Sequence, residues 1–316
     1  MLLILNFGRL YNFNSNFAHI HHNIKEMKRL IHIILTIAIA FPTMATSYER
    51  RLARMNDHFD HAEWSEVLDE TRKMVDMKPT DVEPYSAALV AAQFLNDIPA
   101  ENKYLMLSQN NRVHIDSLLQ HVYVRTRLIH NAQVYEKLLL NLKANNRWLS
   151  RVFNIYLLDF YNFARKTQET ITIADELLQA TPDNLRFKKI KANALFYQGD
   201  NEEAIELYEN ILTCDSTDYE VLTFLGAYYT TLDIMAINEV DSMYLHDAQP
   251  VDSMYINRKQ HIIDTRIQHT LSLLRKAHEM QPSEHLNSQI EQLSSVTCQL
   301  PAKPEKRKSG KNRVAK

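Results

Sequence analysis

The feature that most limits the fold of this chain is its shortage of glycine. Only four glycines occur in 316 residues, and just two of them, Gly199 and Gly226, lie in the body of the chain. Average usage is about 7%. Because glycine supplies the φ > 0 turns of hairpins and the loops that cradle phosphates, a chain this poor in it is expected to be helical throughout. The sequence therefore predicts an all-α fold without a Walker loop or a dinucleotide-binding fingerprint.

Charge is distributed unevenly along the chain. Residues 1–46 carry +3 and residues 301–316 carry +6, so a chain with a net charge of −2 leaves −11 on the body between them. An acidic body argues against nucleic acid as a partner, since a basic face would be expected there. The basic tail 301–316 is expected to be disordered, either as a solvated end or as a contact for anionic lipid or polymer.

The amino-terminal region has the pattern of a secretory signal peptide over residues 27–45. A basic start at Met27-Lys28-Arg29 precedes an apolar run over 30–41, and small residues follow. The run is shorter than the roughly 20 residues that a membrane-spanning helix needs, although an uncleaved anchor or a buried helix are alternatives. We expect cleavage near Thr46, which leaves no integral membrane segment.

Residues 1–26 show neither helical periodicity nor helix caps. We interpret them as a mis-annotated leader and Met27 as the true start of translation. The sequence thus predicts an exported protein of a bacterial envelope, either periplasmic or secreted.

The clearest internal unit covers Leu185–Thr217. Its first half contains a cluster of apolar residues that ends before Gly199-Asp200. Its second half has apolar residues at i, i+3, i+4 and i+7, from Ala204 through Tyr208 to Ile211. This unit resembles the tetratricopeptide repeat (TPR), a helix–turn–helix of about 34 residues. In that pattern Gly199 caps the first helix and Ala204 is small because the paired helices approach closely there.

Neighbouring segments follow in register. Pro182 and Ser216 stand 34 residues apart at equivalent breaks, and Gly226 lies inside Leu225-Gly226-x-x-Tyr229, which is similar to the leucine–glycine–tyrosine core of the repeat. Glycine within a helix costs about 1 kcal/mol relative to alanine. We therefore expect a neighbouring helix to press on the backbone at Gly226.

The resemblance implies an α-solenoid, an all-α superhelix of TPR-like pairs. We expect repeats over 150–300 and degenerate TPR-like helical repeats over 46–149, where the pattern has drifted most after residue 96. A more polar helix over Ser283–Val296 is expected to close the array, as the end of a solenoid requires.

An inserted segment at about 232–260 interrupts the last clear repeat before its second helix at Ile262–Met280. It contains Val-Asp-Ser-Met-Tyr twice, starting at Val240 and Val251. Insertions in solenoids are often functional. The alternative is a local duplication that forms a helical hairpin broken at Pro250, with its Met and Tyr side chains packed on the body.

No motif in the chain carries recognisable chemistry. His58 and His61 lie among carboxylates but straddle an expected turn, and neither a His-Glu-x-x-His nor a Gly-x-Ser-x-Gly motif occurs. Cys214 and Cys298 form neither a disulfide framework nor a zinc site; they could pair in an oxidising compartment, but we interpret them as two separate buried side chains. We therefore expect no catalytic residues, no metal, no cofactor and no enzyme activity.

The family resemblance places a partner in a concave groove lined by the first helices. Lys189 and Asn193 resemble half of a clamp for a terminal carboxylate, but Phe224 stands where the clamp would continue, so an aromatic grip on an extended peptide is favoured. The groove residues expected on this pattern are Ile155, Asp159, Asn162, Phe163, Arg186, Lys189, Asn193, Phe196, Tyr197, Thr223 and Ala227.

The sequence therefore predicts an exported, non-catalytic scaffold that binds a protein or peptide partner, with cell-envelope assembly as one expected role. One alternative is a carbohydrate-binding or enzyme-associated helical-repeat receptor component. Another is a structural protein that self-associates through its acidic body and basic tail. The oligomeric state does not follow from the sequence.

Overall fold

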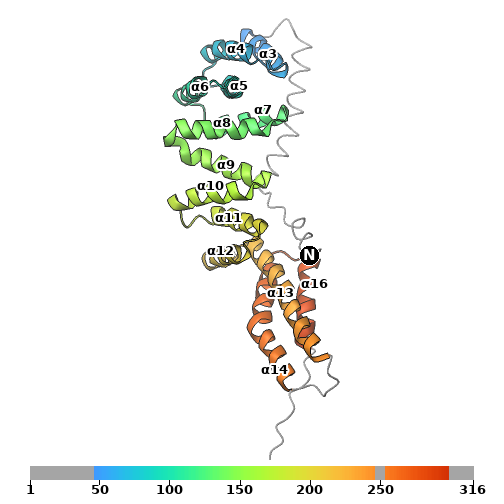
Figure 1. The fold of residues 1–316 in the computed structure, drawn as a ribbon. Helices are drawn as coiled ribbons and strands as arrows, with labels where there is room; N and C mark the ends of the chain where they lie inside the picture. Colours follow the sequence, from blue (N-terminus) through green and yellow to red (C-terminus); the bar gives the residue numbers. More distant parts are fainter. Residues whose placement is uncertain (1–45, 246–252, 299–316) are drawn as a thin grey trace, which may run out of the picture. The chain divides into compact units, whose positions relative to one another are not determined.

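The computed structural model describes residues 46–245 and 253–298 (Figure 1). Every regular element within these two ranges is a helix, which confirms the all-α expectation. The leader 1–26, the signal peptide 27–45, Pro250 and the basic tail 301–316 lie outside the described residues. The chain divides into two compact units, unit 1 ending at Phe160 and unit 2 beginning at Tyr161. The division falls inside a helix, α9 (Ser150–Ala164).

Unit 1 is built from consecutive helix pairs joined by short turns. Its first helices are α3 (Ser47–Asp60), α5 (Val82–Phe94) and α7 (Ile115–Leu128), and their respective partners are α4 (Trp64–Met77), α6 (Ile98–Asn110) and α8 (Ala132–Asn145). A short 3₁₀ helix, η1 (Arg147–Leu149), leads into α9. Fully buried side chains such as Tyr85, Leu105 and Leu138 fill the space between these helices.

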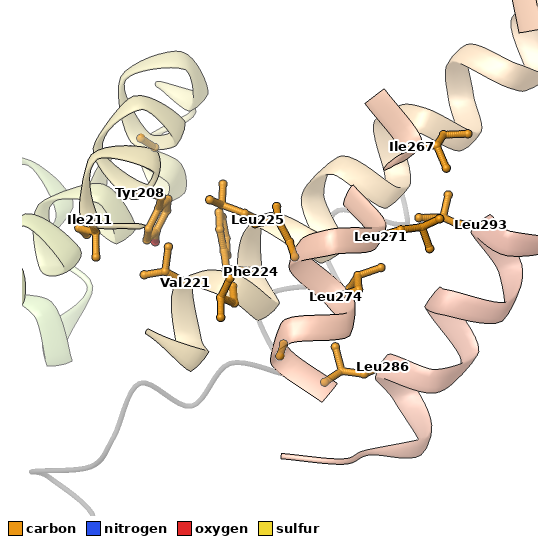
Figure 2. Packing of buried hydrophobic residues seen from close by; sticks show 14 of the residues in the cluster. Tyr208, Ile211, Val221, Phe224, Leu225, Ile267, Leu271, Leu274, Leu286 and Leu293 are labelled. Atoms are coloured by element: carbon orange, nitrogen blue, oxygen red, sulfur yellow. The ribbon is translucent and has the colours of Figure 1, made fainter. Parts of the chain in front are cut away.

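Unit 2 continues the pairs with α10 (Thr167–Ala180), α11 (Leu185–Gln198) and α12 (Asn201–Cys214). Then come the long helix α13 (Tyr219–Leu245), α14 (Ser253–Ile262), the π-helical segment η2 (Ile263–Ile267), α15 (Gln268–Met280) and the closing helix α16 (Glu284–Cys298). Figure 2 shows their shared core, in which Tyr208 and Phe224 lie on one side and Leu274 and Leu286 on the other.

A left-handed turn residue marks the middle of each successive pair from α3 to α12. Positive φ values of 58°, 54°, 53°, 56° and 104° occur at Ala62, Asn96, His130, Arg165 and Gly199, which are spaced by 34, 34, 35 and 34 residues. The second helix of each pair begins two residues later every time. This recurrence matches the length of a tetratricopeptide repeat, and it runs through the stretch after residue 96 in which the sequence pattern has drifted.

These turns explain how a glycine-poor chain reverses direction. In each of them the amide after the turn residue donates to a carbonyl five residues back, as in Asp97 N to Ala92 O at 2.9 Å and Asp200 N to Leu195 O at 3.0 Å. The bond satisfies a carbonyl that the end of the helix would otherwise leave unpaired. Only Gly199 adopts the left-handed conformation without a steric cost; the other turn residues pay roughly 1 kcal/mol each.

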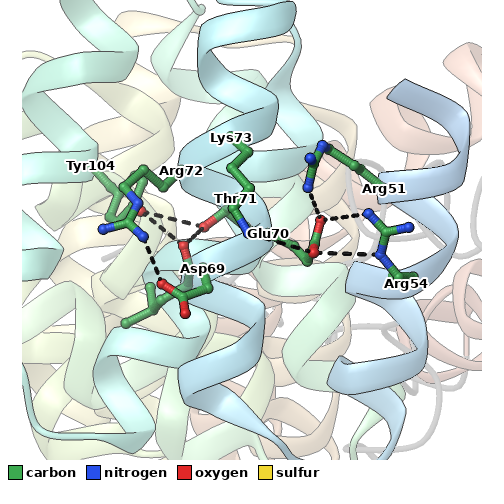
Figure 3. A network of polar contacts seen from close by, with 9 residues as sticks. Arg51, Arg54, Asp69, Glu70, Thr71, Arg72, Lys73 and Tyr104 are labelled. Carbon is green, nitrogen blue, oxygen red and sulfur yellow. Dashed lines mark hydrogen bonds and ion pairs between the residues drawn. The ribbon is translucent and has the colours of Figure 1, made fainter. Parts of the chain in front are cut away.

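Polar side chains tie the first pairs of unit 1 together (Figure 3). Glu70 of α4 accepts hydrogen bonds from Arg51 at 2.8 Å and from Arg54 at 3.3 Å, both of α3. On the other side of α4, the Thr71 hydroxyl lies 3.4 Å from that of Tyr104 in α6. The burial of Glu70 opposes its ionisation, but the two guanidinium groups outweigh it and lower its pKa.

Gly226 lies where a neighbouring helix leaves no room for a side chain. A β-carbon at this position would stand 2.6 Å from Cδ2 and 3.0 Å from Cγ of Leu274 in α15. The expectation that a helix presses on the backbone here is therefore confirmed. The partner helix α15 follows the inserted residues in the sequence, so α13 and α15 form one pair despite the insertion.

The inserted residues lengthen this pair. Helix α13 runs without a break to Leu245, and α14 returns alongside it, where the Tyr255 hydroxyl donates to Asp241 at 2.8 Å. The hairpin alternative included Met side chains packed on the body, and this part was wrong, since Met243 and Met254 are 52% and 54% exposed. The buried interpretation of Cys214 was wrong as well, because its thiol is exposed at the end of α12.

Candidate partner-binding surface

The expected groove residues fall on both units. Ile155 and Asp159 belong to unit 1 and are half-buried on α9. The remaining nine belong to unit 2, where they lie on the end of α9 and on the first helices α11 and α13. Placement on first helices is what the repeat pattern implies, but the side chains differ in whether they reach the surface.

Three of the expected residues are buried in unit 2. Ala227 packs within the core, and the Thr223 hydroxyl donates to the carbonyl of Tyr219 at 2.9 Å. Asn193 accepts a hydrogen bond from the Tyr208 hydroxyl at 2.5 Å. These side chains are buried within unit 2, and the bond between Asn193 and Tyr208 joins α11 to α12.

The Lys189 ammonium group is engaged within its own unit. It lies 2.5 Å from Asp218 and 2.9 Å from Glu220. Burial lowers the pKa of Lys189, but the two carboxylates outweigh that effect and raise it above its ordinary value. Since both half-clamp residues already have partners in the fold, a clamp at Lys189 and Asn193 would have to break these contacts first.

Phe196 belongs to an aromatic cluster. Its ring meets Phe224 edge-on at 4.9 Å and Tyr228 at 6.1 Å, and Phe224 lies 4.4 Å from Tyr208. Edge-to-face pairs of this kind contribute about 1 kcal/mol beyond the area that they bury. The half-buried Phe196 ring therefore stabilises the contact between α11 and α13.

Tyr197 and Phe163 remain as exposed aromatic side chains, at 50% and 39%. Arg165, which the sequence analysis did not single out, places its guanidinium group 5.6 Å from the centre of the Tyr197 ring. Its left-handed turn at the end of α9 brings it there, and no residue-type signal reveals such a turn. We call Phe163, Arg165 and Tyr197 the aromatic face.

Asn162 and Arg186 are half-buried on the same helices as the aromatic face, α9 and α11. Arg186 extends over the ring of Phe187 at 5.8 Å. Tyrosine and arginine are the side chains that most often carry binding energy at protein interfaces.

Residues 46–245 and 253–298 hold no cluster of three or more His, Cys, Asp or Glu side chains placed to bind a metal. His58 contacts Glu63 at 2.6 Å, and His61 contacts the carbonyl of Asp57 at 2.8 Å, so both stabilise the turn after α3.

A shallow cleft of about 530 Å³ lies along α13 in unit 2, lined by Leu232, Met235, Ala236, Asn238, Glu239, Ser242 and Arg266. Among the described helices, none has the length and apolarity to cross a bilayer.

No family model matches the sequence, and no curated protein does. Among solved structures, the chain is similar to a putative protein binding protein from Bacteroides ovatus, with 18% identity and a TM-score of 0.45 over 70% of this chain and 100% of that one. A TPR repeats protein from Bacteroides fragilis has 15% identity and a TM-score of 0.37 over 79% of this chain and 99% of that one. A tetratricopeptide repeat protein from Parabacteroides merdae has 9% identity and a TM-score of 0.34 over 79% and 100%.

TM-scores this low leave the fold to be judged from the chain's own helices. From α3 to α12 the pairs recur at 34 or 35 residues, and each of them turns through a left-handed residue. Ala204 is fully buried, and a β-carbon on Gly226 would stand 2.6 Å from Leu274 of the neighbouring helix α15. The chain has the fold of a tetratricopeptide-repeat protein.

Proposed function

We propose that this protein is a non-catalytic scaffold that binds a protein or peptide partner through the aromatic face of unit 2. The observation that carries the proposal is the Tyr197 ring, half exposed beside the Arg165 guanidinium group, while its neighbour Phe196 is held in the aromatic cluster. A fixed backbone with exposed Tyr and Arg side chains binds with little loss of conformational entropy.

The partner that fits this surface is an extended or helical segment with an apolar or acidic side chain. An apolar group would pack on Phe163 and Tyr197, and a carboxylate would pair with Arg165. Of the expected groove residues, Asn162 and Arg186 would contribute at the edge, while Asn193, Thr223 and Ala227 would act only through packing.

We also propose that the protein is exported and that it takes part in assembly of the cell envelope. Thr46, near which cleavage is expected, is the N-cap of α3: its hydroxyl accepts from Glu49 N at 3.2 Å, and Glu49 accepts from Thr46 N at 2.6 Å. A chain that starts at Thr46 would keep this capping box, and its new ammonium group would face a carboxylate. Mass spectrometry of the mature amino terminus tests this point, and a peptide from residues 1–26 in the native protein would contradict it.

Crosslinked pull-down from envelope fractions tests the binding proposal. We expect a reproducible partner with the unaltered protein and its loss with the double variant Phe163→Ala/Tyr197→Ala. The matched control is Met77→Ala/Leu128→Ala, which removes two side chains of similar exposure from unit 1 and should leave capture unchanged.

Both double variants should melt within about 1 °C of the unaltered protein, because exposed substitutions change stability little. Equal loss of the partner in both variants, or retention in both, would contradict the placement of the site on unit 2.

A further inference from the structure

Two segments of the chain carry charge of a single sign. Residues 137–158 contain four basic residues and no acidic one, and residues 200–220 contain eight acidic residues and no basic one. The first segment belongs to unit 1 and the second to unit 2. Neither has a part in the proposed function above, and their opposite charges make them complementary.

The basic segment presents exposed cations beside exposed apolar side chains. Arg147 and Arg151 are exposed, and no ion pair within the described chain involves either of them. Trp148 between them is 62% exposed, and Leu140 in the preceding helix α8 is 42% exposed. A tryptophan this open to water is costly unless something covers it, because it leaves a large apolar area exposed.

The acidic segment centres on α12. Glu202 and Glu206 stand one helical turn apart on its exposed side, and within the described residues neither forms an ion pair. Other carboxylates of the segment are engaged within unit 2, such as Glu203 with Lys191 at 2.8 Å and Asp218 with Lys189. In the described parts of the chain, Arg147 in η1 and Arg151 at the start of α9 thus supply two unpaired cations, and Glu202 and Glu206 supply two unpaired anions.

The charge of the whole body points to a local partner rather than an extended polyanion. With −11 between residues 46 and 301, a bilayer or a nucleic acid would be repelled by most of the surface. A protein segment in contact with Arg147 and Arg151 feels mainly the local field, since screening limits exposed charges to about 8 Å at physiological salt. The acidic segment on α12 of another copy meets this requirement.

We infer that Arg147, Trp148 and Arg151 of one copy dock on Glu202 and Glu206 in α12 of a second copy. The contact joins different surfaces of the two copies, so it is heterologous and can continue into chains of more than two. The aromatic face keeps its role for another protein.

Sedimentation velocity of the full mature chain over a range of concentrations tests the inference. We expect reversible association that weakens as salt is raised from 0.05 to about 0.5 M, because exposed charge pairs are screened. Charge reversal in either Arg147→Glu/Arg151→Glu or Glu202→Lys/Glu206→Lys should weaken association about 10-fold or more. A mixture of the two reversed proteins should associate more than either one alone, because each reversed site meets an oppositely charged site on the other protein, and the chain carrying all four substitutions should also recover association.

Trp148 also reports the contact directly. The chain has two tryptophans, and Trp64 stacks on Phe94 at 4.1 Å inside unit 1. In a Trp64→Phe variant, the emission of Trp148 should shift to shorter wavelength as concentration rises, and the shift should vanish with Arg147→Glu/Arg151→Glu.

A protein that sediments as a monomer at every concentration would overturn the inference. So would association that survives both charge reversals, which would point to another face of the chain. Loss of the pull-down partner without any change in association would affect only the proposed function, so the two failures are distinguishable.

Discussion

Unit 1 and unit 2 repeat the same turn at nearly the same interval but fill their interiors with different chemistry. In unit 2, rings from Phe196, Tyr208 and Phe224 pack together and Gly226 admits a leucine side chain. In unit 1, the interior includes the carboxyl group of Glu101 and the guanidinium group of Arg125. The comparison teaches that the backbone turn, rather than a fixed set of core residues, maintains the repeat.

The buried acids of the two units sharpen this contrast. Asp233 in unit 2 accepts from the Thr270 hydroxyl at 2.7 Å and from Arg266 at 3.0 Å. Glu101 in unit 1 has one oxygen 3.4 Å from Asn141, and its other oxygen, Oε2, has no hydrogen-bond partner among the described residues. A buried carboxylate without a full set of donors is costly when ionised.

The largest effect is expected at the closest helix contact of unit 2. Gly226→Leu would force a side chain into the space of Leu274, and overpacking of this kind costs about 3 kcal/mol. Thermal unfolding should show a lowered Tm, while Thr231→Leu on the exposed side of α13 serves as the control. An unchanged Tm for Gly226→Leu would contradict the pairing of α13 with α15.

Glu101 makes unit 1 sensitive to pH. Burial raises its pKa from 4.5 to about 7, against the smaller opposing effects of Asn141 and Lys137, and Asp97 adds to the rise. The folded chain therefore holds a proton that the unfolded chain releases above pH 4.5. The stabilisation that the protonated Glu101 provides is fully present below pH 4.5 and is lost as pH rises through 7. The total decrease in the free energy of unfolding is at most about 3 kcal/mol.

Glu101→Gln tests this difference, because it keeps the shape and removes the titration. We expect urea unfolding of the variant to change less between pH 5 and pH 8 than that of the unaltered protein, with the variant more stable at pH 8. Equal slopes of stability against pH in the two proteins would contradict ionisation of a buried Glu101.

Substitutions at two adjacent residues of unit 2 should distinguish a side chain that stabilises the fold from one that binds the partner. Phe196→Ala removes a half-buried ring from the aromatic cluster and should cost about 2 kcal/mol, which chemical denaturation measures. Tyr197→Ala should change stability by less than about 0.5 kcal/mol because the ring is half exposed. If the two costs were reversed, the assignment of Phe196 to the fold and Tyr197 to the surface would be wrong.

The smallest effects, of opposite sign in the two units, are expected at the turns. Gly199→Ala in unit 2 places a β-carbon on a residue with φ of 104° and should cost about 1 kcal/mol. His130→Gly in unit 1 relieves a strained φ of 53° and should stabilise by a few tenths of a kcal/mol, since the added chain entropy of glycine offsets part of the gain. Melting temperatures that fall in both variants would argue against a shared turn.

The sequence predicted the helical class and the clearest repeat because Gly199, Ala204 and Tyr208 stand at positions where residue type reflects geometry. The repeat pattern was difficult to recognise after residue 96, because Asn96 and His130 occupy turn positions at which the repeat usually has a recognisable residue. Positive φ at such residues depends on the hydrogen bonds of the whole turn, and residue type alone does not indicate it.

The surface was harder to predict than the fold. Periodicity places Asn193, Thr223 and Ala227 on first helices, but their burial depends on α12 and α15, which pack over those helices from elsewhere in the sequence. Arg165 was missed for a related reason, since its position over Tyr197 follows from a turn. The described residues of the expected insertion belong to α13 and α14, which lengthen the last pair.

Site-specific photocrosslinking tests the central claim most directly. A photoreactive residue would replace Tyr197 in unit 2 or, as the matched control, Met77 in unit 1, in otherwise unaltered protein within intact cells. The account predicts a discrete crosslinked partner from position 197 and none from position 77. Equal crosslinking from the two positions, or a partner captured only from position 77, would contradict a binding surface on the aromatic face.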